Sequence, residues 1–379
     1  MHLDDHGRLI LNGKQFFPLG LFVVHCANGQ YEKQLQEIAD SPFNTVMNYA
    51  INECGSKASL PQIRAYLDKL ESHDLKLIFS LKDYFGDDRE DLEAIKTRVE
   101  AFKDHPAIIS WYLNDELPPK HIPELQKRYE LIKRLDPRRP IWSVHWNSNW
   151  LLAEAHTTDV VGADPYPIGN HAITLVSLMA DRANLSGKPL WLVPQIFNWK
   201  DYPWDRRSKT GRPPTYEEMR AMTYLATNHG AKGLIYYSYF NIRDDEDFET
   251  RWPQIQQIAS EVNQLKPVFL SIDKIENVHV DCDNDAIDFK LMKKDDQYYL
   301  FAVNTLASVL NDVSFEQPIK TSKIDVLFEK DRFLSPDKSG GFTDDFAPHE
   351  VHIYRWVKDM PQTHTDEHRL FAPPAWQTG

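Results

Sequence analysis

Two acidic side chains stand next to each other at the end of an apolar segment. Residues 108–113 form a β-prone apolar run that stops at Asn114, Asp115 and Glu116, and Pro118 follows closely. Because proline lacks a backbone donor, strand pairing cannot continue beyond this point. A strand that ends in two carboxyl groups can supply general acid–base chemistry. The alternative is that the two acids only cap the N-terminus of the next helix.

The segments before and after this pair alternate regularly between apolar β-prone runs, which predict strands, and runs with a helical hydrophobic period, which predict helices. The expected strands are residues 18–24, 43–49, 75–82, 108–113, 140–146, 159–163, 189–197 and 233–240. The expected helices are residues 31–39, 60–72, 89–102, 122–135, 151–156, 173–184, 216–228 and 252–265. Eight strand–helix units predict an α/β fold, a (β/α)8 TIM barrel over residues 15–266.

The two ends of the chain have other patterns. Residues 1–14 contain the turn pair Asn12 and Gly13 between apolar residues, which predicts an N-terminal hairpin. Short period-two runs within residues 267–358 predict a C-terminal antiparallel β-sandwich-like domain. These runs are residues 275–280, 286–292, 298–304, 312–315, 322–328 and 350–356. Residues 359–379 are polar and proline-containing, and we expect an irregular tail.

Composition narrows the class of ligand. The formal net charge is -13 and no lysine- or arginine-rich run stands out, which argues against nucleic acid or an anionic membrane as partner. The three cysteines lack metal-site spacing, so we expect neither a metal nor a cofactor. No apolar leader or membrane-length segment is present, so we expect a soluble protein, either cytoplasmic or exported after signal-peptide removal. The oligomeric state is not predicted.

A parallel barrel brings the C-terminal ends of its strands to one face. The candidate site residues at or just after these ends are Asp83, Asn114, Asp115, Glu116, His145, Trp146, Asp164, Tyr166, Gln195, Trp199 and Tyr237. Such a ring of carboxylates, amides and aromatic rings suits a polyhydroxylated ligand with an apolar face. A glycine-rich phosphate loop does not accompany it. The predicted ligand is therefore a carbohydrate.

Several of these residues have a second interpretation. Asp164 precedes Pro165 and could bond a backbone turn, and His145 could be a structural donor. Asp83 could bind a substrate hydroxyl or pair with a neighbouring cation. Tyr237 and the residue before it point to opposite sides of their strand, so only one of the two can serve the site.

The long connection after the seventh expected strand is aromatic and charged. Residues 198–214 contain Trp199, Tyr202 and Trp204 and lie on the predicted active face. Long loops at this face often form lids or subsite walls. The alternative is a mobile surface loop without contact to a ligand.

Four segments, in their order along the chain, resemble the barrel glycoside hydrolases. They are L-I-L-N-G-K-Q-F-F-P-L-G, H-P-A-I-I-S-W-Y-L-N-D-E, D-P-Y-P and F-A-P-H-E-V-H-I-Y-R-W. In the large clan of retaining barrel glycosidases, the acid/base glutamate ends strand four and the nucleophilic glutamate ends strand seven. Glu116 matches the first position, but Gln195 occupies the second. A neutral amide cannot form the covalent intermediate of that mechanism.

The Asp115–Glu116 pair resembles the pair of glycoside hydrolase families 20 and 123. These are β-N-acetylhexosaminidases in which the substrate's own 2-acetamido oxygen attacks the sugar. The resemblance implies that Glu116 protonates the leaving oxygen and later activates water, while Asp115 holds the acetamido N–H. Tyr166 or Tyr237 could donate to the acetamido carbonyl.

Three alternatives stay open at this point. An inverting β-glucosidase or β-galactosidase could use Glu116 as acid and Asp164 as base, which needs a carboxyl separation of roughly 6.5–9.5 Å. Gln195 could be an engineered replacement of a natural glutamate. The protein could also be a non-catalytic carbohydrate-binding protein, although a binder gains nothing from two mutually repelling carboxylates.

Overall fold

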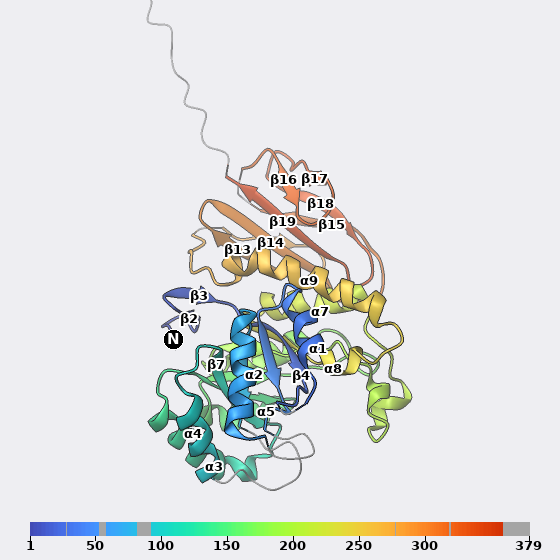
Figure 1. The fold of residues 1–379 in the computed structure, drawn as a ribbon. Coiled ribbons are helices and arrows are strands. Elements are labelled where there is room, and N and C mark those ends of the chain that lie inside the picture. Colours follow the sequence, from blue (N-terminus) through green and yellow to red (C-terminus); the bar gives the residue numbers. More distant parts are fainter. Residues whose placement is uncertain (28, 53–57, 82–91, 277, 318–319, 359–379) are drawn as a thin grey trace, which may run out of the picture.

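Eight parallel strands close into a barrel (Figure 1). The structure is a computed structural model that describes residues 1–379 except 28, 53–57, 82–91, 277, 318–319 and 359–379. The barrel strands are β4 (Leu19–Val23), β5 (Thr45–Asn48), β6 (Lys76–Ser80), β7 (Ile108–Asp115), β8 (Ile141–His145), β9 (Val160–Ala163), β10 (Leu190–Leu192) and β11 (Gly233–Tyr236). β11 pairs with β4 and β10 pairs with β9, which closes the ring. The predicted (β/α)8 TIM barrel is confirmed.

Helices follow the strands and cover the outside of the barrel. They are α1 (Glu32–Ala39), α2 (Leu60–Ser72), α3 (Leu92–Phe102), α4 (Ile122–Leu135), α5 (Ser148–Glu154), α6 (Leu175–Asn184), α7 (Tyr216–Asn228), the short α8 (Tyr239–Ile242) and α9 (Phe248–Phe269). Reciprocal capping boxes start α2, between Ser59 and Gln62, and α7, between Thr215 and Glu218. In the described part of the chain, no helix has the length and apolar character needed to cross a bilayer.

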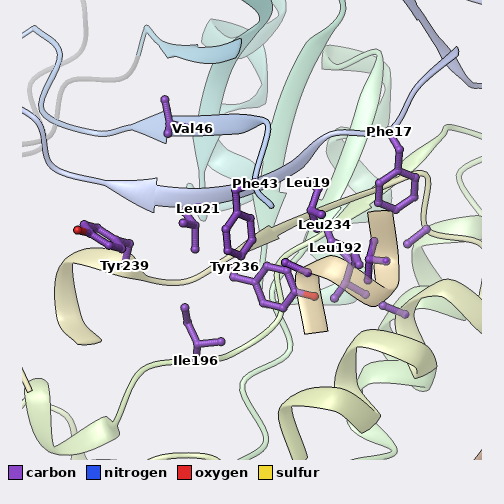
Figure 2. Packing of buried hydrophobic residues seen from close by; sticks show 14 of the residues in the cluster. Phe17, Leu19, Leu21, Phe43, Val46, Leu192, Ile196, Leu234, Tyr236 and Tyr239 are labelled. Carbon is purple, nitrogen blue, oxygen red and sulfur yellow. The ribbon is translucent and has the colours of Figure 1, made fainter. Parts of the chain in front are cut away.

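The barrel strands are buried on both faces, as parallel strands under helices must be. Inside the barrel, Trp142 packs against Phe22, Tyr112 and Trp191, with ring centroids 5.9, 5.2 and 6.1 Å away. Outside, a second cluster joins strands to helices, and Figure 2 shows Tyr236 within this cluster. The large aromatic rings fill the interior and leave a solid floor below the face where the strands end.

The N-terminal segment covers the opposite end of the barrel. It forms a three-stranded antiparallel sheet of β1 (His2–Leu3), β2 (Leu9–Leu11) and β3 (Lys14–Phe16). Asn12 and Gly13 have φ values of 51° and 76°, as the predicted tight hairpin turn requires. Leu9 is buried in the interior cluster of the barrel. The sequence did not predict the extra strand β1.

The C-terminal domain consists of two antiparallel sheets with an apolar core between them. One sheet has the order β12-β15-β18 and the other β13-β14-β19-β16-β17. The bounds are β12 (Asp281–Cys282), β13 (Ile287–Lys294), β14 (Gln297–Asn304), β15 (Leu310–Glu316), β16 (Ile324–Val326), β17 (Phe333–Leu334), β18 (Phe342–Phe346) and β19 (Val351–Val357). The strand expected at residues 275–280 was wrong, because the described residues there form no strand. Strands β12, β17 and β18 were not predicted.

Helices α7 and α9 lie between the barrel and the second domain (Figure 1). Phe301 and Ile353 of that domain belong to the same apolar cluster as the outer barrel residues. His229, just after α7, links the two domains: Nδ1 lies 2.6 Å from Asp181 of α6 and Nε2 lies 2.7 Å from Asp288 of β13. Burial alone would lower the pKa of His229, but its hydrogen bonds to Asp288 and Asp181 outweigh burial and raise it to about 9.

We expect His229→Gln to destabilise the protein in a pH-dependent way. The folded-state pKa is raised above the unfolded value of 6.5, so the stabilisation is complete below pH 6.5 and is lost as the pH rises through about 9. The loss at pH 6 should be on the order of 1–2 kcal/mol, because the group is partly exposed to solvent. Thermal unfolding at pH 6 and pH 10 measures the difference. His279→Gln, at an exposed histidine, is the control. An equal loss of stability at both pH values would contradict the raised pKa of His229.

Candidate active site

Asp115 is held by two tyrosine hydroxyls at the end of β7. The register between β7 and β8 shifts between Tyr112 and Asn114, which is a β-bulge. Past this bulge, Tyr112 donates to Oδ1 of Asp115 at 2.8 Å and Tyr49 donates to the same oxygen at 3.2 Å. Burial and the charge of Asp115 raise the pKa of both tyrosines well above their usual range, so they remain donors. The Asp115 carboxylate is therefore fixed in one position.

Glu116 leaves the strand in an unusual backbone conformation. Its φ is 59°, in the left-handed region, and its N–H donates to the carbonyl of Val144 at 2.9 Å. For a residue other than glycine this region costs roughly 1–2 kcal/mol. Strain of this kind is concentrated at functional sites. Glu116 lines the same cavity as Asp115.

Asp164, just after β9, brings a third carboxyl group to this cavity. Its side chain is hydrogen-bonded to Glu116, and its Oδ1 is buried without a partner among the described residues. Burial, followed by the charge of Glu116, raises the pKa of Asp164 well above its usual range. Two carboxyl groups in contact cannot both ionise readily, so sharing one proton between them is favoured. In this structure the pair lacks the wide gap that the inverting alternative requires.

Aromatic side chains form much of the rest of the cavity, which has a volume of about 930 Å³. Tyr166 lies against Phe197 and Tyr237, with ring centroids 5.0 and 5.6 Å away. Tyr237 lines the cavity, whereas Tyr236 points outward into the helix-facing cluster (Figure 2). The two tyrosines therefore point to opposite sides, as strand alternation predicts. Trp146 is half exposed at the rim.

The long loop after β10 forms one wall of the cavity. Two short 3-10 helices, η3 (Trp199–Asp201) and η4 (Arg206–Lys209), order it. Trp199 is buried beneath the guanidinium of Arg207, which lies 3.5 Å from the ring centroid. The hydroxyl of Tyr202 donates to Oδ1 of Asn241 at 2.9 Å and lies 3.0 Å from the hydroxyl of Tyr237. The expectation of a loop that contributes to the cavity agrees with this placement.

His145 and Asn114 lie beside the cavity rather than on its surface. Both are fully buried, and both contact Glu154 of α5: His145 Nε2 at 2.8 Å and Asn114 Nδ2 at 2.7 Å. Asn114 also accepts from the N–H of Leu117 at 3.2 Å. These bonds tie the ends of β7 and β8 together. The two residues therefore support the site from behind, and Asp83 lies outside the described residues.

The side chain of Gln195 is committed to the backbone. Its Oε1 accepts from the N–H of Ile168 at 3.0 Å, and its Nε2 donates to the carbonyl of Phe197 at 3.2 Å. It is fully buried and does not line the cavity. A glutamate here would place a carboxylate oxygen against the carbonyl of Phe197. The local structure therefore fits glutamine better than glutamate.

Sequence reasoning missed several residues of the site. Tyr49 is the last residue of the second expected strand, so the strand-end rule could have found it. Tyr112 reaches Asp115 only because of the bulge, and Glu154 acts from a helix, so neither had a signal in the sequence. Phe197 and Arg206 line the cavity only because the loop after β10 folds over it.

Among the described residues, one group of side chains has metal-ligand composition, but it lies away from the cavity. Asp68, Glu71 and His105 offer ligand atoms close together. Nδ1 of His105 accepts from the N–H of Ala107 at 3.2 Å, so its Nε2 carries the proton and donates to Asp68 at 3.0 Å. Because Nε2 has no free lone pair in that state, the group is a hydrogen-bonded cluster rather than a metal centre.

Comparison with protein families agrees with this geometry. Residues 69–185, which include Glu116 and Asp164, match the family model described as glycosyl hydrolases family 2, TIM barrel domain. The prediction of a glycoside hydrolase barrel is confirmed. No curated protein sequence matches the chain.

Solved structures with the same fold include several glycosidases. A protein titled glycoside hydrolase has a TM-score of 0.63 at 13% identity, over 94% of this chain and 96% of that chain. A β-galactosidase from Bacillus circulans sp. alkalophilus has a TM-score of 0.61 at 9% identity, over 89% of this chain and 99% of that chain. A putative α-galactosidase/melibiase from Bacteroides fragilis NCTC 9343 has a TM-score of 0.60 at 14% identity, over 89% and 78%. At these identities the likeness is one of fold, and the matches do not bear on families 20 and 123.

We expect Asp164→Asn to stabilise the protein, and to do so only above acidic pH. The pKa of Asp164 is raised above its unfolded value of 3.8, so the folded state binds more protons and the wild-type stability falls as the pH rises above 3.8. Asparagine has about the same size and keeps a hydrogen-bond donor, but it does not ionise, so the variant avoids this loss of stability at higher pH. The melting temperatures should differ at pH 8 and converge at pH 3.5. A variant that is less stable than the wild type at pH 8 would show that Asp164 is ionised there.

Proposed function

We propose that the protein hydrolyses β-linked 2-acetamido sugars, with the substrate's acetamido oxygen as nucleophile. The observation that carries this proposal is the fixed Asp115 carboxylate directly beside Glu116. The side chain of Gln195, which follows the seventh barrel strand β10, is already bonded to the backbone, so this position cannot supply a nucleophile. A nucleophile supplied by the substrate itself explains both the fixed Asp115 and the absence of a nucleophile at Gln195.

Glu116 acts first as the general acid. It protonates the glycosidic oxygen while the acetamido carbonyl oxygen attacks C1 from the other face, which gives an oxazolinium ion and the free leaving group. Asp115 accepts the acetamido N–H and stabilises the positive charge that develops on the ring. Tyr49 and Tyr112 prevent the carboxylate from turning away. The hydroxyl of Tyr166 or Tyr237 can donate to the acetamido carbonyl.

Glu116 then acts as the base for water. Once Glu116 has given up its proton, Glu116 and Asp164 are both ionised and in contact. Because the two charges repel each other, the pair binds a proton more strongly and is therefore a stronger base. The oxazolinium cation offsets this charge during the lifetime of the intermediate. Water loses its proton to the pair and opens the oxazolinium ring at C1. Two inversions at C1 give net retention of configuration.

The contact between Glu116 and Asp164 favours one alternative function. In this function the protein hydrolyses a plain β-glucoside or β-galactoside, and Asp164 is the second catalytic carboxyl group beside Glu116. A retaining two-carboxylate site needs a separation of roughly 5–5.5 Å, so the sugar would have to part the pair. One of the structural neighbours is titled β-galactosidase, which makes galactosides a necessary test. The tyrosines at the cavity floor and the loop wall support binding of a chain end, and therefore exo action.

The test of the substrate is a comparison of four aryl glycosides: the β-N-acetylglucosaminide, the β-N-acetylgalactosaminide, the β-glucoside and the β-galactoside. We expect release from the acetamido sugars only, with retention and with inhibition by a thiazoline analogue of the oxazoline. Asp115→Asn should abolish this inhibition. Equal cleavage of the plain glycosides would favour the alternative, and binding without cleavage of any of the four would favour a carbohydrate-binding protein.

The test of the acid is Glu116→Gln. Turnover should fall on the order of a thousandfold for a sugar leaving group, and less for an activated aryl leaving group that needs little protonation. Steady-state kinetics on both substrates measures the two losses. Glu100→Gln, on the exposed side of α3, is the matched control. Equal losses on both substrates would count against Glu116 as the general acid.

A further inference from the structure

The basic residues of the cavity gather on one wall. Among the described residues that line it, these are His171, Arg206 and Arg207, and we refer to them as the basic wall. His171 follows β9 and the two arginines follow β10. Thr210 donates to Asn170 at 3.0 Å, so the two loops are joined next to these residues. The basic wall is therefore one surface made from two loops.

Arg207 is committed within the loop. Its guanidinium binds both carboxylate oxygens of Asp205, at 2.9 and 2.7 Å, and lies flat on the ring of Trp199. Arg206 differs, because its side chain is exposed and makes no hydrogen bond or close ion pair among the described residues; it acts on the neighbouring Asp205 only through its charge. The imidazole of His171 is also exposed and unpartnered within the described chain. Arg206 is therefore the cation of the basic wall that can bind a ligand.

The charges of the cavity are separated. Asp115, Glu116 and Asp164 lie together at the floor, and the fourth acidic lining residue, Asp205, is paired with Arg207 at the basic wall. The chain as a whole carries a formal net charge of -13. A negative group on a bound ligand would be repelled at the floor and attracted at the basic wall. The floor therefore suits a neutral sugar ring, and the basic wall suits an anionic group on the part of the ligand that extends outward.

We propose that the sugar on the leaving side of the cleaved bond carries an anionic substituent, and that Arg206 binds it with His171 alongside. This inference rests on the proposed function, because it assumes that the 2-acetamido sugar occupies the floor. The planar guanidinium matches the paired oxygens of a carboxylate or a sulfate ester. The substrate class is an acidic saccharide in which a β-linked acetamido sugar precedes a uronic acid or a sulfated sugar.

The test uses three disaccharides that differ at one carbon. In each, a β-linked N-acetylglucosamine is joined to glucose, to glucuronic acid or to glucose 6-sulfate. Because an exposed ion pair contributes modestly, kcat/KM should be about fivefold higher for at least one anionic disaccharide than for the glucose one, and high salt should reduce the preference. The preferred anion distinguishes a carboxylate from a sulfate.

Arg206→Gln should remove this preference by lowering kcat/KM for the anionic disaccharide to the value measured for the glucose disaccharide with the same variant. Lys209→Gln is the matched control, because Lys209 lies on the same short helix η4 but does not line the cavity. Equal kcat/KM for all three disaccharides, or a preference that survives Arg206→Gln, would overturn the inference and leave the proposed function intact.

If none of the disaccharides is cleaved, the proposed function fails, and binding then decides this inference separately. Calorimetry with the Glu116→Gln variant measures the affinity for each of the three. Tighter binding of an anionic disaccharide, lost in the double variant with Arg206→Gln, would support the basic wall as its site. Equal affinities, or no binding, would overturn it.

Discussion

Three carboxyl groups lie close together at the floor of one cavity, and the contacts around them reduce the repulsion between their charges. Like charges in contact away from water repel strongly. Asp115 receives two tyrosine hydroxyls, and Asp164 and Glu116 are joined by a hydrogen bond in which they share a proton. The cavity therefore holds fewer negative charges than carboxyl groups. The proton that remains is the one that general acid catalysis requires.

Rigid elements hold these groups in position. The bulge in β7 re-aims the strand end, and the left-handed backbone of Glu116 ends the strand at the cavity. Behind them, Glu154 binds both Asn114 and His145, which ties β7 to β8 through α5. A site of this kind works only if its carboxyl groups stay within a fraction of an ångström of their positions. The closed barrel provides that stiffness, since each strand is bonded on both sides.

Reaction and specificity lie on different parts of the fold. The carboxyl groups that we propose to react lie at or just after strand ends, whereas the basic wall and the exposed Trp204 lie on loops. Loops can change without disturbing the barrel, so they are the natural place for substrate selection. The C-terminal domain is fastened to the barrel by apolar packing on α7 and α9 and by the His229 clamp. The cavity lining includes no residue of that domain within the described chain.

The sequence by itself determined the barrel, because hydrophobic period and turn residues are local properties that survive without tertiary contacts. It also determined that Asp115 and Glu116 stand at a strand end. Only the tertiary structure decided what these groups do to one another. Asp164 is 48 residues from Glu116 in the printed sequence, and their shared proton exists only because β7 and β9 bring them into contact. Gln195 was expected at the cavity, yet its amide bonds to backbone groups whose positions depend on neighbouring loops, and no local pattern encodes such a bond.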